Sequence, residues 1–471
     1  MTETTTAAAA AGLAGPGWAR PGSAGPGSAE SWSAGPGSAE PGSDRHGPAG
    51  ALAADIEGAR PAALLPLRRN LQFQTLWAGS AAATLGRSVA DVAYPLAILT
   101  VTGSPAQAGL FAAAETTGMI LAGLPAGQLA DRRSPRMIVI VAEAIRAAVT
   151  ATIAAALIFG WLSLPLLILA AVALGVGQSA TGTARMLLVR AVVPKEQLTR
   201  ALTQDEVRIN GADLAGPPLG GALFGLRLLA HAVPFVFTAA SFVLSLVTAV
   251  LVRAVPDRPS QPDAGPDRPP SRGGSGMLAG IRAIWGNPVL RATTLLIAIV
   301  NSVGASLGLI AVVLLRAQSV SPAMIGVALA GAAVGGLAGA PLVRPLHRLR
   351  PGVLLIAVST SLVPLFALLA VPDGPWWMAG VLFVAMLGVP SIRVLLDVLI
   401  LRQAPAAERG RIIAAVMTLM TAGMPAGLAA SGLLLQYLSA SATMLTLAGI
   451  LAIGCAYCAA RPQLWRARWP E

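Results

Sequence analysis

The stretch Gly127-Gln128-Leu129-Ala130-Asp131-Arg132-Arg133-Ser134-Pro135-Arg136 is a short basic loop between two apolar segments, at 105–130 and 137–159. Each apolar segment is long enough to cross a bilayer as a helix, which takes about 20 residues. Arginines are costly inside hydrocarbon but are frequent in loops on the cytoplasmic face. The stretch therefore predicts two transmembrane helices joined on the cytoplasmic side.

The composition extends this prediction to the whole chain. Of its 471 residues, 55% are hydrophobic and 11% are charged, and the mean hydropathy is +0.70. Soluble proteins carry about 25% charged residues, which they need on their surface. A large soluble core would not remove that need, whereas a surface in contact with lipid does. We therefore expect an all-α membrane protein.

Apolar segments of similar length recur along the chain and predict twelve transmembrane helices. They span 73–99, 105–130, 137–159, 163–186, 207–227, 231–252, 288–314, 321–343, 352–371, 375–401, 411–437 and 440–460. A stretch rich in Pro, Arg, Asp and Gly divides them into six and six. The expected parts are a disordered cytoplasmic tail (1–65), an N-terminal half (66–252), a cytoplasmic linker (253–287), a C-terminal half (288–460) and a short tail (461–471).

The distribution of basic residues predicts the topology. Segments on the side of the quoted loop hold most of them, including Arg68, Arg132, Arg185, Arg208, Arg344 and Arg461, whereas the opposite loops hold only Arg227 and Arg316. Since basic residues concentrate on the cytoplasmic side, both termini should be cytoplasmic, in a bacterial inner membrane. The same asymmetry explains the net charge of +12 without a nucleic-acid partner.

The two halves also resemble each other. Gly127, Arg132 and Arg136 follow the second predicted helix, and at one constant offset Gly339, Arg344 and Arg348 follow the eighth. Six-helix units repeated in parallel orientation are a known transporter plan.

The quoted loop resembles the G-x-L-a-D-r-x-x-r-R/K signature of the major facilitator superfamily, at the position where that family has it. The resemblance implies that Gly127, Asp131, Arg132 and Arg136 form a conformational latch, in which Asp131 meets the start of helix 11 near Arg409–Arg411. Without the resemblance, the stretch would be a charged loop that only sets the topology. The second-half copy has Val343 in place of the aspartate.

The fifth helix contains Gly216-Pro217-Pro218-Leu219-Gly220-Gly221, which matches the G-P-x-x-G-G end of a signature found in exporter branches of the superfamily. The upstream glycines of that signature are replaced by Thr203 and Ala212. The resemblance implies an exporter-type kink formed by Gly216, Pro217, Gly220 and Gly221. A structural kink of any membrane helix is the alternative.

Further segments resemble the branch that contains macrolide-efflux and enterobactin-export proteins. They include the opening from Arg69 to Trp77, 102–105, 193–198 and 408–411, and the resemblance runs from about residue 66 to 460. That branch often has an acidic residue after the glycine of helix 1, but here Gly86 is followed by Arg87, and Asp91 comes one turn later.

Ionisable residues at membrane depth are candidates for proton coupling or substrate contact. Glu115 lies about 15 Å into its helix by helical rise and has no base within a turn, so it is a candidate for reversible protonation, unless Arg87 clamps it. Asp213 is a second candidate, which could instead pair with Arg208.

Three pairs have an acid and a base within one helical turn: Arg87 with Asp91, Glu143 with Arg146, and Arg393 with Asp397. Internal ion pairing that only stabilises packing competes with a functional role for each of them. By analogy with the fold, helices 1, 4, 7 and 10 line the cavity, which adds Tyr94 and Asn301 to the candidates.

These features favour a secondary active exporter of hydrophobic or amphipathic small molecules that works by proton antiport and alternating access, as a monomer. An uptake symporter or a non-transporting sensor of the same fold are the alternatives. We do not expect an enzyme. A nucleotide-binding P-loop needs a lysine after a glycine, whereas the only lysine, Lys195, follows Pro194, so the chain should not hydrolyse nucleotides. The three histidines adjoin neither a nucleophile nor a metal-ligand set, and Cys455 and Cys458 should be inert packing residues, so we expect no cofactor or metal.

Overall fold

A computed structural model describes residues 67–226, 228–252, 282, 284–286, 288–395 and 409–465. The predicted tail at 1–65 and most of the predicted linker at 253–287 lie outside these residues. The first six long helices are α2 (Leu71–Thr102), α3 (Pro105–Arg132), α4 (Pro135–Phe159), α5 (Leu164–Val192), α6 (Leu198–Gly225) and α7 (Val233–Leu251). The next six are α9 (Pro288–Ala317), α10 (Pro322–Gly339), α12 (Pro351–Leu369), α13 (Gly374–Met386), α15 (Arg409–Tyr437) and α16 (Ala440–Ala459). Short helical turns are η1 (Leu67–Arg69), η2 (Lys195–Gln197), η3 (Leu228–His231), η4 (Ala340–Leu342), α11 (Val343–Leu346) and α17 (Pro462–Trp465).

Local sequence sets where several helices begin and end. The side chain of Asn70 accepts a hydrogen bond from the Phe73 N–H and caps α2, and Ser104 caps α3 in the same way just before Pro105. Gly103 ends α2 and Gly160 ends α4, both in the left-handed conformation at φ +65° and +73° that glycine adopts readily. These signals make the turns short, so consecutive helices run antiparallel, while much of the packing joins non-consecutive helices such as α3 with α5 and α2 with α7.

Hydropathy along the described helices is consistent with a membrane location. Nine candidate spans are long and apolar enough to cross a bilayer. The remaining three long helices, α2, α3 and α6, are less apolar, and they carry Arg87, Glu115 and Asp213. The helices that carry Arg87, Glu115 and Asp213 are therefore the ones that hydropathy alone does not detect.

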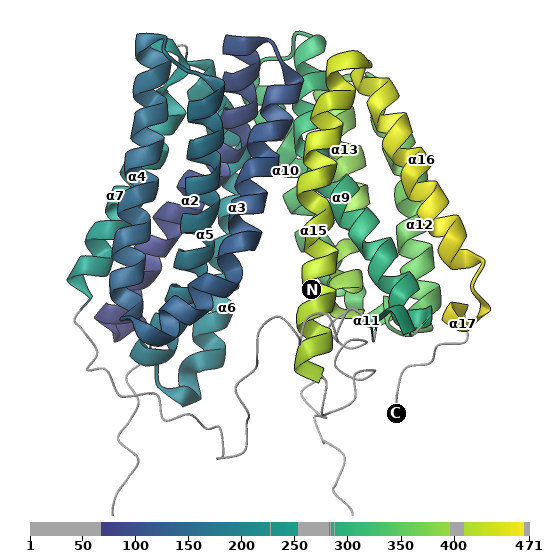
Figure 1. Cartoon of the computed structure of the whole chain (residues 1–471), viewed down its shortest axis with the longest axis horizontal. Helices are drawn as coiled ribbons and strands as arrows, with labels where there is room; N and C mark the ends of the chain where they lie inside the picture. Colours follow the sequence, from purple (N-terminus) through teal and green to yellow (C-terminus); the bar gives the residue numbers. More distant parts are fainter. Residues whose placement is uncertain are drawn as a thin grey trace, which may run out of the picture. The chain divides into compact units, whose positions relative to one another are not determined.

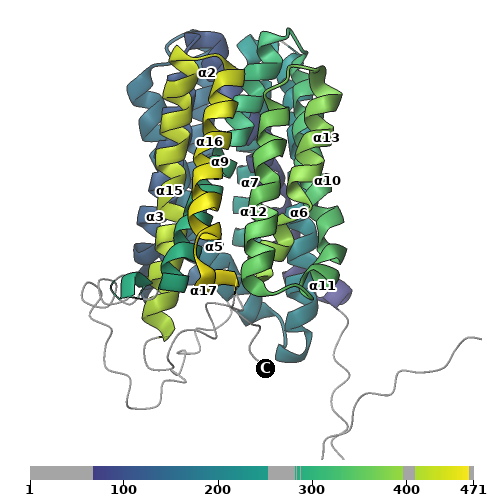
Figure 2. The ribbon, with the colours of Figure 1, turned by 90° about the vertical axis from the view of Figure 1, so that its right-hand side faces the viewer.

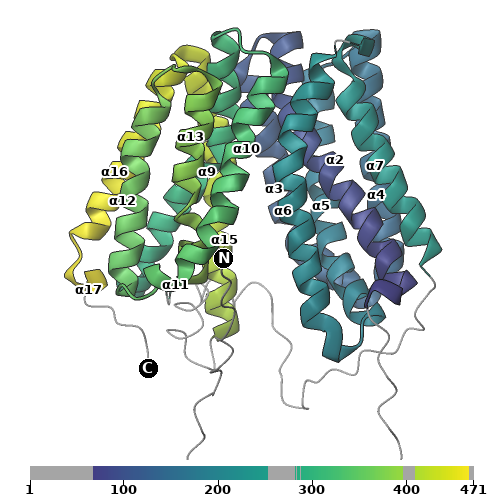
Figure 3. The ribbon, with the colours of Figure 1, turned by 180° about the vertical axis from the view of Figure 1, so that it is seen from behind.

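The helices form two groups that follow the sequence (Figure 1). α2 to α7 pack mainly on one another, and so do α9 to α16. The views from the side and from behind show the same division (Figures 2 and 3). Between the groups, α6 packs on α10 and α3 packs on α15. α3 and α10 are the second long helices of their halves, and α6 and α15 are the fifth, so both contacts join a second helix to a fifth helix, as expected for a repeated six-helix unit. The predicted twelve-helix fold is confirmed.

We call the end of the bundle where α2 begins and α3 ends the basic end, and the end where α2 ends and α3 begins the opposite end. Two helices reach further toward the basic end than we expected, because α5 continues to Val192 and α6 already begins at Leu198. Arg185 and Arg208, which stood at the ends of the predicted helices 163–186 and 207–227 and were counted among the cytoplasmic segments, are therefore further from the helix ends than expected. Both lie inside helices, with side chains that are 15% and 7% exposed.

Candidate functional site

The halves meet at the opposite end through glycines. Gly109 of α3 faces Gly432 of α15, and a Cβ added at Gly432 would lie 2.8 Å from the Cα of Gly109. Small residues of this kind let helices in a membrane approach until their backbones touch. Neither Gly109 nor Gly432 therefore has room for a larger side chain.

The predicted kink motif of α6 is a packing motif with two faces. Gly216 and Gly220, four residues apart, press on α2 at Ser88 and Val89. Pro217 and Gly221, displaced by one residue, face α10, where Gly326 packs on the Pro217 carbonyl and Gly221 on that of Pro322. The motif thus joins a helix of the first half to a helix of the second. Its link with export remains a prediction.

Polar contacts reinforce the same end. Arg316 at the end of α9 donates to the carbonyl of Leu96 (3.1 Å) and to the hydroxyl of Thr100 (2.9 Å) on α2. The Ser104 hydroxyl donates to the side-chain oxygen of Gln436, 2.9 Å away. Together with the glycine crossings, these bonds close the bundle at the opposite end.

The predicted latch is only partly described. Arg136 donates through Nε to the carbonyl of Ala249 (3.1 Å) and through its terminal nitrogen to that of Val250 (2.6 Å), so it caps the end of α7. Arg132 is exposed, and the space beside Gly127 is open. The side chains of Asp131 and of Arg409–Arg411 lie outside the described residues, so the latch remains a prediction.

An ion triad joins α2 to α6 near the middle of both helices. Arg87 donates to Asp91 (2.6 Å) and to Asp213 (3.2 Å), and the Ser88 hydroxyl also donates to Asp213 (2.9 Å). The expected alternative of Asp213 with Arg208 is wrong, because Arg208 pairs with Asp205 at 2.7 Å. The carboxylates are 45% and 44% exposed.

Glu115 lies near the middle of α3 and is half-buried. Within the described part of the chain it makes neither an ion pair nor a hydrogen bond, since Arg87, which could have clamped it, is engaged by Asp91 and Asp213. A carboxyl with no direct ion pair at membrane depth is costly as an anion. Its role in proton exchange remains a prediction.

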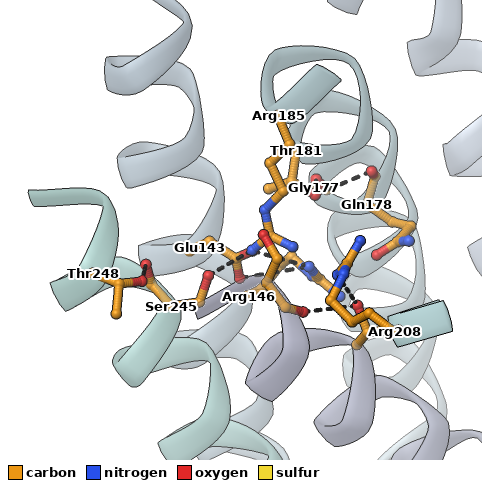
Figure 4. Close-up of polar contacts among 11 residues, drawn as sticks. Glu143, Arg146, Gly177, Gln178, Thr181, Arg185, Arg208, Ser245 and Thr248 are labelled. Carbon is orange, nitrogen blue, oxygen red and sulfur yellow. Dashed lines mark hydrogen bonds and ion pairs between the residues drawn. The ribbon is translucent and has the colours of Figure 1, made fainter. Parts of the chain in front are cut away.

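A third cluster lies deeper in the first half (Figure 4). Glu143 of α4 is completely buried and accepts from Arg146, 3.4 Å away, and from Arg185 of α5. Arg185 also donates to the hydroxyl of Ser245 on α7. The guanidinium of Arg146 lies 4.0 Å from the ring centre of Phe242. Sequence predicted the pair within α4, but not the second arginine, which comes from a neighbouring helix.

Glu143 should matter greatly for stability. We expect Glu143→Gln to lower the free energy of unfolding by about 3–5 kcal/mol, because it leaves two buried guanidinium groups without an anion. The thermal unfolding midpoint in detergent measures this. Ser245→Ala is the control, with a smaller expected loss of about 1.5–3 kcal/mol for one hydrogen bond to a charged group. A Glu143→Gln protein as stable as the wild type would contradict the assignment.

A pocket of about 370 Å³ opens between the clusters. α2, α4, α5 and α6 form its walls, and its lining residues lie on the parts of α2, α5 and α6 toward the basic end. The charged lining residues are Arg87, Arg146, Arg185, Arg208 and Asp205. Sequence reasoning named Arg87 as a candidate, Arg146 as part of a packing pair and Arg208 as a possible partner of Asp213, but counted Arg185 only among the cytoplasmic basic residues. Asp205 and Arg208 are three residues apart, and this spacing could have predicted their ion pair within one helix.

The other predicted residues lie elsewhere. Tyr94 is buried between Phe111 and Phe235, with ring centres 4.5 and 5.0 Å away, so its expected place on a cavity wall was wrong. Asn301 donates to the carbonyl of Met420 on α15. Arg393 is exposed, and Asp397 lies outside the described residues. Cys455 and Cys458 are free thiols buried in α16.

Comparison with known proteins agrees with this architecture. The family model of the Major Facilitator Superfamily matches residues 76–316. A multidrug efflux pump, Tap, of Mycolicibacterium fortuitum is 27% identical over 389 residues, which cover 80% of this chain and 90% of that protein. Tap of Mycobacterium tuberculosis H37Rv is 26% identical, over 81% and 90% of the two chains.

Solved structures share the fold at low sequence identity. A bacterial homologue of the human lysosomal transporter Spinster, in an inward-facing and occupied conformation, has a TM-score of 0.68 at 16% identity, over 86% of this chain and 99% of that one. The nucleoside transporter NupG has a TM-score of 0.67 at 11% identity, over 84% and 100%. The chain therefore belongs to the Major Facilitator Superfamily and is a multi-pass membrane transporter of small molecules, not an enzyme.

Proposed function

We propose that this transporter exports amphipathic small molecules from the cytoplasm by alternating access, in exchange for protons. One observation carries the proposal: the halves are joined by the contacts at the opposite end, while the polar pocket lies toward the basic end. Basic residues concentrate on the cytoplasmic face of membrane proteins. With the basic end in the cytoplasm, the pocket is positioned to load from inside the cell.

Two further observations support the direction and the coupling. The relatives with the quoted identities are named multidrug efflux pumps, and they align over 90% of their length. Glu115 supplies a carboxyl that forms no direct ion pair with the described residues, on a helix that contacts the second half. A proton taken up there from outside would neutralise it, and its release inside would complete one cycle. The chain works as a monomer in this scheme, because both halves of the pathway come from one chain.

Everted vesicles test this proposal. We expect hydrophobic and amphipathic drugs to collapse an imposed pH gradient in vesicles that contain the wild type, because export would consume it. Glu115→Gln should remove at least about 90% of this response, since a fixed neutral side chain carries no proton. Glu196→Gln is the matched control, because Glu196 is exposed at the basic end.

The outcomes separate the parts of the proposal. A response that Glu115→Gln leaves unchanged would reject Glu115 as the proton carrier. If the drug instead moves together with protons down the imposed pH gradient, the protein would be an uptake symporter. No response to any compound, from a protein that is correctly folded in the vesicles, would reject drug–proton exchange.

A further inference from the structure

The pocket toward the basic end contains more positive than negative charge. Four guanidinium groups line it, and Asp205 is the only carboxylate among its described lining residues. An apolar or cationic drug would gain little from such a wall. The charge of the lining is therefore the feature to explain.

The ion pairs show where the excess lies. Arg87 has two carboxylates, Asp91 and Asp213, and Arg208 has Asp205. Arg146 and Arg185, by contrast, share the single carboxylate of Glu143. Two guanidinium groups and one carboxylate leave one positive charge on this side of the pocket, whereas Arg87 with its two carboxylates leaves one negative charge on the side of α2 and α6. The electropositive part of the pocket is thus the wall formed by α4 and α5.

The same two arginines have unused hydrogen-bonding capacity. The Nε atoms of both are buried and have no hydrogen-bond partner among the described residues. The residue Arg146 is only 3% exposed. Buried donors are nearly always satisfied, so two charged donors without acceptors beside one pocket are unusual. A bound anion is an acceptor that would satisfy them.

The contacts of Arg185 join α5 to α4 and α7, but the charge of Glu143 does not require a second arginine. The Arg185 side chain points to Glu143 and Ser245 rather than out of the bundle at the basic end (Figure 4). Without it, Glu143 and Arg146 would still balance in charge, and Phe242 would still cover the Arg146 guanidinium. A guanidinium without a carboxylate of its own at membrane depth costs stability, and a bound anion would offset this cost.

We propose that Arg185, together with Arg146, binds the anionic group of the transported molecule. A carboxylate or sulfonate suits the planar fork of a guanidinium, which donates two parallel hydrogen bonds. Apolar lining residues such as Met186, Leu202 and Ile209 would contact the rest of the molecule. The volume of about 370 Å³ lies within the range of small-molecule sites, about 300–1,000 Å³. The substrate class is then an amphipathic organic anion. This inference rests on the proposed function only because it places the transported molecule in this pocket.

Binding to the purified full-length protein in detergent tests the subsite without any transport step. The probes are naphthalene-2-sulfonate and 2-naphthylmethylammonium, which share one ring system and differ in charge. We expect the sulfonate to raise the thermal unfolding midpoint of the wild type and the ammonium to leave it unchanged. Calorimetric titration then gives the dissociation constant for the sulfonate.

Arg185→Gln should weaken sulfonate binding on the order of 10- to 100-fold, which corresponds to loss of a charge-assisted hydrogen bond. Its midpoint without ligand should equal or exceed that of the wild type, because the excess charge is gone. Arg69→Gln removes the same charge from an exposed position at the basic end and should bind as the wild type does.

Three results would overturn the subsite: no sulfonate binding by the wild type, equal binding by Arg185→Gln, or stronger binding of the ammonium. A large fall in the midpoint of ligand-free Arg185→Gln would also overturn it, because it would show that Arg185 stabilises the fold. Binding with the expected pattern but no gradient-driven export would reject the proposed function and leave the subsite intact.

Discussion

Replacement of Gly432 by leucine should prevent the bundle from closing at the opposite end. The backbones of α3 and α15 touch there, and even a Cβ at position 432 would lie 3.0 Å from the carbonyl oxygen of Pro105. Overpacking of a close-packed contact costs about 1–3 kcal/mol, and 1.4 kcal/mol changes a population tenfold. We expect the closed arrangement to lose about tenfold or more in population, and transport to fall accordingly, because alternating access needs both states.

Chemical cross-linking of cysteines reports this population. The side chains of Ser104 and Gln436 are hydrogen-bonded across the two halves, so a short bifunctional thiol reagent should join Ser104→Cys to Gln436→Cys in a background in which Cys455 and Cys458 are alanines. Gly432→Leu should slow this cross-link at least about tenfold. Gly449→Leu on α16 is the control, since Gly449 is exposed and a Cβ there meets open space. Equal cross-linking rates in the two leucine variants would show that the glycine crossing does not control closure.

Arg87→Gln should abolish transport. Arg87 is the cation for both Asp91 and Asp213, so its loss leaves two carboxylates in the membrane with no positive partner in the triad. We expect gradient-driven transport to fall by at least about tenfold, since the charge that holds α2 to α6 is lost. The effect on stability should be only about 1 kcal/mol, because the three side chains are 29–45% exposed and solvent screens their attraction.

A second substitution separates charge balance from coupling. Arg87→Gln combined with Asp213→Asn restores the net charge of the triad, so the unfolding midpoint should return toward that of the wild type. Transport should stay low, because the ionisable link between the two helices is still absent. Recovery of transport in the double variant would show that only the net charge matters, and full activity of Arg87→Gln alone would remove the triad from the mechanism.

Sequence predicted the helices well and the clusters only within single helices. Apolar length and the Ser104-Pro105 cap are local signals, and so is the spacing of Arg87 with Asp91 or of Glu143 with Arg146. The links of Arg87 to Asp213 and of Arg185 to Glu143 depend on how neighbouring helices are rotated about their axes. A single sequence does not encode that rotation in a local pattern. Arg185 was therefore counted as a loop cation, although it lies in a charge cluster.

The two prolines of α6 have a mechanical consequence. Neither Pro217 nor Pro218 has a backbone N–H, so the carbonyls of Asp213 and Leu214 lack their usual helical donors. Bending stiffness of a helix comes largely from these bonds, and α6 therefore resists bending least just between Asp213 and the residues that touch α10. The pocket-lining turns near Asp205 can tilt while the turns beyond Gly221 stay seated on Pro322. A change of charge at Asp213 would therefore act on α6 where the helix bends most easily.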